Sequence, residues 1–377
     1  MRILHVITSI DRGGAECHLL SLVKGLDKTR YDVDVAYMVG NGSLKRDFDE
    51  SGIKIYNLRM TSRVDPRALY RLIKLIFKNK YRIIHTHGFR PDLYGTVSAL
   101  ISRTPIIISS KHNDEDYFNN MVLAFLHRLV SRFQDRIICI SEHVKKFTIQ
   151  VGVNNHHKVK RIYYGLDWER FDRIKNFRYV RDEFGIKDND FFIGSVARIS
   201  PQKGLSFLIK AMRKVIDIRK DVKLVVVGQP RQFVKGDWIL KDDLLQMVEE
   251  LYLKNHIFFA GSRNDIQEVM LSLDLFVLPS LWEGFGLVLL EAMATQKPIV
   301  ASRVSTIPEI VSDGVTGLLI PPANVEELTG AILRLAENRE MACRMGKAGR
   351  KRLEDHFGLK RMVKQTETIY EEELSKR

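Results

Sequence analysis

Short apolar, β-branched runs alternate with amphipathic stretches along the whole chain. Runs of this length, bounded by glycine or polar residues, are typical of buried parallel strands, and amphipathic stretches are typical of the helices that cover a sheet. This alternation indicates an α/β fold with parallel, doubly wound sheets. The pattern predicts strands at 2–8, 32–39, 53–58, 81–85, 105–109, 136–141 and 160–163, and then at 191–197, 223–227, 256–260, 275–279 and 298–302.

At 377 residues, of which 45% are hydrophobic, the chain is long enough for two domains that each bury a core. The longest apolar runs, such as 121–126, fall far short of the roughly 20 residues that cross a bilayer, and residues 2–8 are expected to form a strand rather than part of a signal peptide. The wide spacing of the three cysteines, Cys17, Cys139 and Cys343, predicts neither a disulfide framework nor a zinc site. We therefore expect a protein of the reducing cytoplasm.

Basic residues are concentrated in the first half of the chain. Residues 1–170 contain 28 Lys and Arg against 17 Asp and Glu, an excess of +11 within a total of +14. Nucleic acid, an anionic membrane surface and phosphorylated substrates all fit such an excess, and charge does not choose among them. Basic amphipathic helices are predicted at 66–82 and 121–133. Their simpler interpretation is an apolar stripe packed on the sheet beneath a solvated basic face, although basic faces also bind anionic lipid.

The densest motif runs from 283 to 294 and directly follows the predicted strand at 275–279. It reads as the end of a buried strand, a glycine turn and a helix. The first amides of a helix have no partner within it and lie at the positive end of its dipole, so the backbone at Phe285, Gly286 and Leu287 can hold a phosphate.

Two carboxylates bracket this turn, Glu283 before the helix and Glu291 in its first turn or so. A carboxylate repels phosphate but accepts two hydrogen bonds from a vicinal diol, as in a sugar or ribose. On spacing alone, two ordinary solvated acids are the simpler interpretation. The uninterrupted strand, turn and helix pattern of 258–294, however, closely resembles the retaining GT-B glycosyltransferases of family 4, the glycosyl transferases of group 1. The resemblance implies that Glu283 contacts the transferred sugar and Glu291 the nucleotide ribose.

The resemblance covers nearly the whole chain and implies a GT-B fold, in which two Rossmann-like, doubly wound domains face a central cleft. It implies an acceptor-binding domain at 1–168, completed by a C-terminal helix at about 358–377, and a nucleotide-sugar-binding domain at 169–357. An extra stretch at 231–241 has no explanation in the sequence.

Three further segments are expected to hold the donor. Gly13 and Gly14 lack the third glycine of a dinucleotide fingerprint and by themselves indicate a tight turn, whereas the resemblance implies a loop that faces a diphosphate. Arg198 and Lys203 follow a predicted strand, and two cations beside a helix N-terminus can neutralise a diphosphate leaving group without a metal ion. The resemblance also implies that the backbone around Arg263 pairs with the nucleotide base.

Polar residues at the ends of two strands are candidates for the acceptor side. His87 and Arg90 follow the strand predicted at 81–85, and His112 follows the one at 105–109, so all three are expected at the carboxyl edge of the sheet. The resemblance implies an active-site role for His112. For His87 and Arg90 two interpretations remain open, acceptor binding and the closing of a βα loop.

Two acidic pairs, Asp32 with Asp34 and Asp114 with Asp116, have the Asp-x-Asp spacing of metal sites in the other large glycosyltransferase fold. The first falls in a strand and the second in an acceptor-side loop, so neither is interpreted as a metal site and no cofactor is expected. The chain departs from the family pattern at Tyr164, where Asn is usual, and at 305–306, where two glycines are common.

Together the residues and the resemblance imply a metal-independent, retaining glycosyltransferase. The expected donor is a nucleotide-sugar, with a UDP-sugar favoured over a GDP-sugar, and the group transferred is hexosyl or N-acetylhexosaminyl. The expected acceptor is lipid-linked or a saccharide of cell-surface polysaccharide synthesis, used at an anionic membrane surface on the cytoplasmic side. Two alternatives stay open: a nucleotide-sugar 2-epimerase of the same fold, and a basic nucleic-acid-binding protein, for which RNA-binding and helix-turn-helix signatures are missing.

Overall fold

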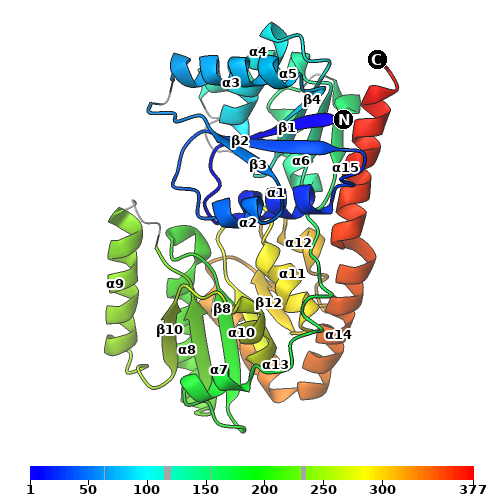
Figure 1. Ribbon diagram of the computed structural model, residues 1–377. Coiled ribbons are helices and arrows are strands. Elements are labelled where there is room, and N and C mark those ends of the chain that lie inside the picture. The colour runs from blue at the N-terminus through cyan, green and yellow to red at the C-terminus, as the bar shows by residue number, and fades with distance from the viewer. Residues whose placement is uncertain (63, 114–119, 154, 231–234) are drawn as a thin grey trace. The chain divides into compact units, whose positions relative to one another are not determined.

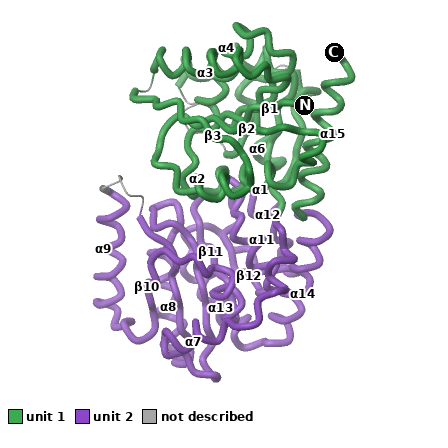
Figure 2. The backbone as a smooth tube through the Cα atoms, in the orientation of Figure 1, with its two compact units in different colours: residues 1–165, 358–377 green, residues 166–357 purple. Residues whose placement is uncertain are grey.

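The structure is a computed structural model that describes residues 1–377 except 63, 114–119, 154 and 231–234. The chain divides into two compact units (Figure 2). Unit 1 consists of Met1–Gly165 and Gly358–Arg377, and unit 2 of Leu166–Phe357. Within the described residues, no helix combines the length and the apolar character that a membrane span requires.

Unit 1 is built on a seven-stranded parallel sheet in the order β3-β2-β1-β4-β5-β6-β7 (Figure 1). The order reverses between β1 and β4, which pair with Ile3 opposite Ile83 and Ile7 opposite His87. At such a reversal the flanking loops diverge at the carboxyl ends of the strands, where doubly wound proteins bind ligands. The strands are β1 (Arg2–Ile7), β2 (Asp32–Tyr37), β3 (Lys54–Asn57), β4 (Ile83–His87), β5 (Ile106–Lys111), β6 (Arg136–Cys139) and β7 (Val159–Arg161).

Helices cover both faces of this sheet. Residues of α1, α2 and α15 share one buried core with β1, and residues of α3 and α4 share the other, while α5 lies beside α4. The helices of unit 1 are α1 (Gly14–Gly25), α2 (Lys45–Asp49), α3 (Pro66–Asn79), α4 (Phe89–Ile101), α5 (Met121–Phe133), α6 (Glu142–Gln150) and α15 (Leu359–Leu374).

The ends of α3 follow from its sequence. The Asp65 side chain accepts hydrogen bonds from the amides of Arg67 and Ala68, and Pro66 occupies the first position, where its missing N–H costs nothing. Lys80 adopts a left-handed φ of 52° and ends the helix. The helix predicted to reach residue 82 therefore stops at Asn79, because the next residues lead into β4.

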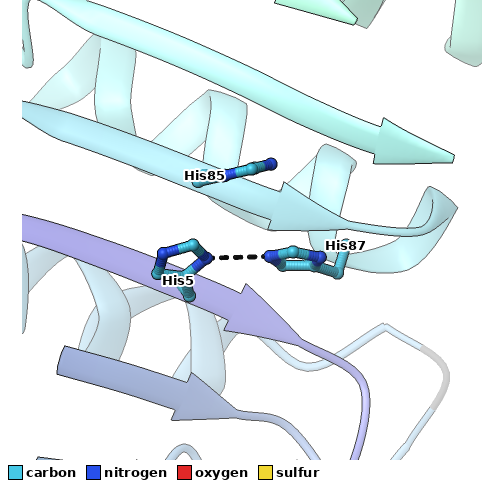
Figure 3. A group of neighbouring side chains, drawn as sticks. All are labelled: His5, His85 and His87. Carbon is cyan, nitrogen blue, oxygen red and sulfur yellow. Dashed lines mark hydrogen bonds between the residues drawn. The ribbon is translucent and has the colours of Figure 1, made fainter. Parts of the chain in front are cut away.

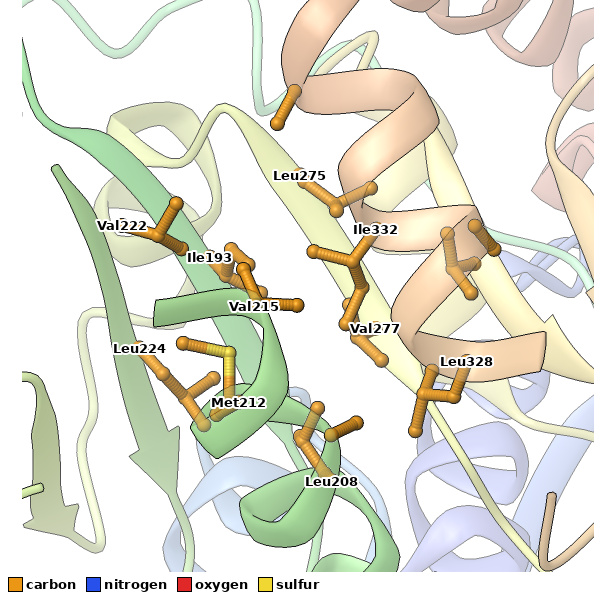
Figure 4. Close-up of a cluster of buried hydrophobic side chains, with 14 of the residues drawn as sticks. Ile193, Leu208, Met212, Val215, Val222, Leu224, Leu275, Val277, Leu328 and Ile332 are labelled. Atoms are coloured by element: carbon orange, nitrogen blue, oxygen red, sulfur yellow. The ribbon is translucent and has the colours of Figure 1, made fainter. Parts of the chain in front are cut away.

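Unit 2 contains a six-stranded parallel sheet in the order β10-β9-β8-β11-β12-β13, which reverses between β8 and β11. Figure 4 shows α8 and α13 packed on one face, where Leu208, Met212 and Ile332 meet strand residues such as Ile193 and Val277. The strands of unit 2 are β8 (Phe191–Val196), β9 (Val222–Val227), β10 (Ile257–Gly261), β11 (Leu275–Leu278), β12 (Ile299–Ser302) and β13 (Leu318–Ile320). Its helices are α7 (Arg178–Glu183), α8 (Leu205–Ile218), α9 (Lys235–Glu250), α10 (Ile266–Ser272), α11 (Leu287–Ala294), α12 (Ile307–Ile310), α13 (Val325–Glu337) and α14 (Arg339–His356).

The prediction of an α/β protein with two parallel, doubly wound sheets is confirmed. Several predicted strand ends were wrong. β2, β6 and β7 each end two residues earlier than expected, whereas β4 continues to His87 and β5 to Lys111, two residues further than expected. Polar residues at the ends of β4 and β5 read as loop in the sequence, yet they are buried and pair with side chains inside the unit. β13 was not predicted as a strand.

Candidate functional site

In unit 2 the loops that follow β8 and β11 are bound to each other where the strand order reverses. The backbone N–H of Leu281 donates to the Gln202 carbonyl at 2.7 Å, and Gln202 Nε2 donates to the Trp282 carbonyl at 2.9 Å. Gly204 has a φ of +63°, and a Cβ at this position would lie 2.1 Å from the carbonyl oxygen of Pro279. Only glycine permits this backbone approach, so Gly204 fixes the spacing of the two loops.

This spacing brings together two residues that were predicted to bind the nucleotide-sugar donor. Lys203 Nζ forms an ion pair with Glu283 Oε1, and the Ser280 hydroxyl donates to the same oxygen at 2.8 Å. The side chains are 14% and 6% exposed, respectively, so the pair is nearly desolvated. A buried carboxylate held by a lysine and a hydroxyl is fixed in orientation, and its second oxygen can accept hydrogen bonds from a diol.

The start of α11 is left open to a ligand. Gly286 precedes the helix at a φ of 86°, and no side chain caps the first amides. The Thr306 hydroxyl donates to the Gly284 carbonyl at 2.7 Å, while the Phe285 ring is buried and lies 6.3 Å from the Phe357 ring, centroid to centroid. The Phe285 side chain therefore anchors the turn, and the backbone is the part of Phe285 and Leu287 that can meet a phosphate.

Glu291 lies in the second turn of α11, slightly later than expected. Its carboxylate is 3.8 Å from the guanidinium of Arg170, a residue that sequence reasoning did not select. Burial raises the pKa of Glu291, and the positive charge of Arg170 opposes that rise. Arg198 differs from the other cations of this region because it is exposed and its side chain has no partner among the described residues. Its charge is available to an anion.

The Arg263 side chain is engaged within unit 2 by four hydrogen bonds. Its guanidinium makes two bonds to the Glu183 carboxylate, at 2.6 and 2.9 Å, and two to Asp265, at 2.8 and 2.7 Å. These bonds raise the pKa of Arg263 and lower that of Asp265 to about 2. A ligand can thus meet this segment through its backbone, as the sequence analysis expected, while the side chain ties β10 to α7.

In unit 1 the glycine pair lies at the start of α1, after β1. Gly13 precedes the helix without a side-chain cap of its own, but a Cβ built on it would lie 2.5 Å from the Glu16 carboxylate, whereas nothing lies within 4 Å of a Cβ built on Gly14. The turn is therefore open at Gly14 only. Arg90 is half-buried in the first turn of α4, and its side chain has no partner among the described residues.

His87 and His112 lie together inside unit 1. Nδ1 of His87 is 3.0 Å from Nε2 of His112, and Nε2 of His87 is 2.9 Å from Nδ1 of His5 on the neighbouring strand (Figure 3). Nδ1 of His112 lies 2.5 Å from the Tyr164 hydroxyl. Both ring nitrogens of His87 and of His112 are therefore engaged within the unit, and His87 is fully buried.

The same cluster contains the one histidine group of the described residues with metal-like spacing, His5, His85 and His87. The nitrogens of His85 bond instead to the Tyr370 hydroxyl at 2.7 Å and the Ser110 hydroxyl at 2.8 Å. The nitrogens of His87 point to the other histidines. Every ring nitrogen of this group except His5 Nε2 is thus bonded to another ring or to a hydroxyl, and a metal ion would have to displace such bonds.

The acidic pair on β2 has a structural role. Asp32 and Asp34 both form ion pairs with Arg2 at 3.1 Å, and Asp34 also accepts a hydrogen bond from Tyr81. The second acidic pair, at 114 and 116, lies outside the described residues.

Sequence reasoning missed several residues that hold the site. Ser280, Arg170 and the hydroxyls at 305 and 306 contact the glutamates or their loop. The departure from two glycines at 305–306 was the available signal. The Thr306 hydroxyl binds the glycine turn, and a glycine at position 306 would have no side chain to make this contact.

Two sequence families match adjoining parts of the chain. The family described as Glycosyltransferase Family 4 matches residues 12–170, and the family described as Glycosyl transferases group 1 matches residues 176–352. The Escherichia coli UDP-Gal:alpha-D-GlcNAc-diphosphoundecaprenol alpha-1,3-galactosyltransferase is 27% identical over 81% of this chain and 79% of its own. The Staphylococcus aureus capsular polysaccharide biosynthesis glycosyltransferase CapM is 24% identical over 94% of this chain and 89% of its own.

Solved structures share the fold. The Anabaena protein HepE, crystallised with UDP-glucose, superposes with a TM-score of 0.86 at 24% identity, covering 98% of this chain and all of that one. Sucrose-phosphate synthase from Thermosynechococcus elongatus gives a TM-score of 0.84 at 18% identity, covering 100% of both chains.

Proposed function

This chain belongs to the group 1 glycosyltransferases of the GT-B fold, and we propose that it moves a hexosyl or N-acetylhexosaminyl group from a nucleotide-sugar to a lipid-linked or saccharide acceptor. A UDP-sugar is the favoured donor, because the E. coli relative is named for UDP-galactose. The diphosphate-linked lipid in that name and the capsular polysaccharide in the name of CapM support an acceptor of cell-surface polysaccharide synthesis.

The observation that carries the proposal is the Lys203–Glu283 ion pair beside the uncapped start of α11. A nucleotide-sugar has a dianionic diphosphate next to a neutral, hydroxyl-rich sugar, and this arrangement offers cations and amides beside a fixed carboxylate. Arg198, Lys203 and the amides of α11 bind the diphosphate, and Glu283 binds hydroxyls of the sugar. Glu291 binds the ribose diol.

The proposed chemistry keeps the anomeric configuration. The acceptor hydroxyl approaches the anomeric carbon on the face from which the diphosphate departs. The bond from that carbon to the diphosphate oxygen breaks, the bond to the acceptor oxygen forms, and the acceptor proton passes to the departing phosphate. Lys203, Arg198 and the α11 amides stabilise the negative charge that develops on the leaving group, which removes the need for a metal ion.

Unit 1 is proposed to hold the acceptor. Arg90, whose guanidinium has no partner among the described residues, is available to an anionic acceptor such as a diphosphate lipid, and His112 lies at the same carboxyl edge of the sheet. His87 supports His112 from inside the unit. The turn at Gly13 and Gly14 is assigned to the donor diphosphate. The reaction is proposed to occur on the cytoplasmic side of an anionic membrane.

A thermal-shift screen tests the donor assignment. A ligand that binds the folded state raises the unfolding temperature, so the correct nucleotide-sugar should stabilise the protein at concentrations well above its Kd. The stabilisation should be reduced in Glu291→Ala, and it should persist in Ile239→Ser, which changes an exposed residue on α9. Failure of every UDP- and GDP-sugar to stabilise the wild type would contradict the proposal.

Product analysis separates transfer from epimerisation. The stabilising nucleotide-sugar is incubated with and without a diphosphate-lipid acceptor, and the sugar and nucleotide products are identified. Transfer requires the acceptor and releases the nucleoside diphosphate. Conversion of the nucleotide-sugar to its 2-epimer without an acceptor would establish the alternative enzyme.

A further inference from the structure

The outer surface of α3, α4 and α5 in unit 1 is apolar and basic without an exposed acid. α3 lies beside α4, and α4 beside α5, over one face of the sheet (Figure 1). The one acidic residue in these three helices is Asp92, which is 1% exposed and paired with Lys111. We define the α3–α5 face by its exposed side chains: Arg67, Tyr70, Arg71, Lys74, Phe77, Lys78, Val97, Leu100, Ile101, Met121, Val122, Phe125, Arg128, Leu129, Arg132 and Phe133.

The apolar part of this face is centred on α5. Met121, Phe125, Leu129 and Phe133 recur every four residues and form one stripe along the helix, with exposed fractions of 87%, 63%, 39% and 48%. A surface helix of a globular protein normally turns its apolar stripe toward the core. α5 turns this one to solvent, and exposed residues of α4 add to it. Isolated exposed apolar residues are ordinary, but a contiguous group marks an interaction surface.

The basic part consists of cations that form no ion pair among the described residues, of which two, Arg71 and Arg128, donate to backbone carbonyls. Arg67, Arg71, Lys74 and Lys78 on α3, and Arg128 and Arg132 on α5, form no ion pair with any described residue. A merely solvated helix surface usually mixes both signs of charge. The complete lack of exposed carboxylates on these helices points to an anionic partner.

We propose that the α3–α5 face docks on an anionic lipid bilayer, with the α5 stripe inserted at the boundary of headgroups and acyl chains. The cations of α3 and α5 bind lipid phosphates beside it. The choice of a bilayer over another anionic partner rests on the proposed lipid-linked acceptor. Two copies of this face would bring like charges together without a compensating carboxylate, so a second copy of the chain is a poor occupant.

Vesicle flotation tests the docking. Vesicles of phosphatidylcholine alone are compared with vesicles that also contain phosphatidylglycerol, at low and high salt. The wild type should bind the anionic vesicles on the order of 100-fold more tightly at low salt, as expected for several cations near a charged surface. High salt should weaken the binding without abolishing it, because salt screens charge but not apolar insertion.

Matched variants separate the contribution of apolar insertion from that of the basic side chains. Phe125→Ser with Phe133→Ser should keep low-salt binding but lose the salt-resistant fraction, whereas Ile218→Ser, an equally exposed apolar change on α8 of unit 2, should behave as wild type. Arg67→Gln, Lys74→Gln and Lys78→Gln together should lose most low-salt binding. The triple change Arg344→Gln, Lys347→Gln and Lys351→Gln removes the same charge from exposed positions on α14 and should leave binding unchanged.

A depth measurement reports insertion directly. Tryptophan introduced as Phe125→Trp should be quenched by lipids brominated near the top of the acyl chains, whereas Ile218→Trp should not. Failure of the wild type to bind anionic vesicles at low salt overturns the proposal. Equal losses in the α3–α5 variants and their controls, or dimerisation through this face in sedimentation, also overturn it.

The donor site is tested in the same preparations. Thermal stabilisation by the nucleotide-sugar should be unchanged in every vesicle-binding variant, because none of them alters a donor residue. Absence of vesicle binding by the wild type, together with normal stabilisation, would refute the docking and leave the enzyme assignment intact. Vesicle binding without stabilisation by any nucleotide-sugar would refute the assignment and leave the docking intact.

Discussion

Nδ1 of His87 lies 3.0 Å from Nε2 of His112, and the two rings stack at an angle of 12°. His5 extends the chain on one side and Tyr164 on the other. Burial lowers the pKa of His5 and of His112 to about 3, so that the rings are neutral at pH 7. A neutral imidazole has one donor and one acceptor nitrogen, and the chain therefore has two fully bonded arrangements, in which all rings have the proton on the same nitrogen.

The surroundings of His5, at the buried end of this series of hydrogen-bonded rings, determine which of the two arrangements forms. Nε2 of His5 has no hydrogen-bond partner among the described residues. A buried N–H without an acceptor is rarer in proteins than a buried acceptor without a donor, so His5 has its proton on Nδ1. His87 and His112 are then protonated on Nδ1 as well, and His112 donates to the Tyr164 oxygen.

Replacement of Tyr164 by Phe should remove the preference for the arrangement in which every ring is protonated on Nδ1. The variant leaves His112 Nδ1 without a partner in the unit, and the two arrangements become similar in free energy. Long-range ¹H–¹⁵N spectra of histidine-labelled protein should show Nδ1–H for His5, His87 and His112 in the wild type and mixed tautomers in Tyr164→Phe. The unfolding free energy should fall by about 1–3 kcal/mol for the lost buried hydrogen bond.

His256 provides the internal control for these spectra. It lies in unit 2, where its Nδ1 is 3.0 Å from the Val222 carbonyl, and its tautomer should be the same in both proteins. An Nε2–H signal for His87 in the wild type would contradict the assignment.

Buried neutral histidines should make the protein unstable in mild acid. The pKa of His5 and His112 is about 3 in the folded protein and about 6.5 when the chain unfolds, so the unfolded state binds more protons between these values. The stability they provide is complete above pH 6.5 and is lost as the pH falls toward 3. Each such histidine contributes up to about 1.4 kcal/mol per pH unit. Urea unfolding at pH 7.5, 6.5 and 5.5 measures the slope.

Exposed histidines provide the comparison for the acid prediction. His156→Gln and His157→Gln change exposed residues and should leave the pH dependence as in wild type. His5→Gln should reduce the slope. A stability that stays constant from pH 7.5 to 5.5 would contradict the burial of neutral rings.

What the sequence could predict depends on whether the contact is local. The turn from Glu283 to Leu287 is a strand end, a glycine and a helix start within one short segment, and its backbone could be inferred from spacing. The hydrogen-bonded series of histidine rings could not be inferred in this way, because His5, His87 and Tyr164 meet only through strand pairing in unit 1. A histidine in an apolar strand such as 2–8 was the one local signal, and it read as part of the strand.

Contacts between distant segments also made the geometry of the donor region impossible to predict from the sequence. Lys203 and Glu283 were selected from separate loops, but their ion pair depends on Gly204 and on the pairing of β8 with β11. Arg170 precedes unit 2's first strand by some distance in the chain, and nothing near it indicates Glu291 as a partner.

Lys203 and Glu283 should contribute to stability only as a pair. Lys203→Met leaves a carboxylate with 6% exposure and no cation, which typically costs about 3–5 kcal/mol, whereas Lys203→Met with Glu283→Gln should recover most of that loss. Both proteins should be inactive. Urea unfolding of the single and double variants measures the coupling, and additive losses would contradict it.

Glu283 and Glu291 should differ kinetically. Glu283→Gln should lower kcat by about 100-fold or more with a smaller change in KM, because its contact with the transferred sugar changes along the reaction. Glu291→Gln should raise KM for the donor by about 10-fold and change kcat less, because a ribose contact is the same in the ground and transition states. Steady-state kinetics with the donor varied distinguish the two, and wild-type kinetics in both variants would exclude the site.

Turnover should persist in a chelator. A diphosphate leaving group develops negative charge that many enzymes neutralise with Mg²⁺ or Mn²⁺, whereas the proposed site uses Lys203, the exposed guanidinium of Arg198 and the uncapped amides of α11. Initial rates in excess EDTA should therefore equal those in Mg²⁺. Arg198→Gln should lower kcat by about 100-fold, since removal of one preorganised group that stabilises charge in the transition state typically costs about 10²–10³ in kcat. Arg219→Gln, which changes an arginine already paired with Asp221 at the far end of α8, controls for loss of charge. Loss of activity in EDTA that Mg²⁺ or Mn²⁺ restores would show that a metal ion, rather than these residues, neutralises the leaving group.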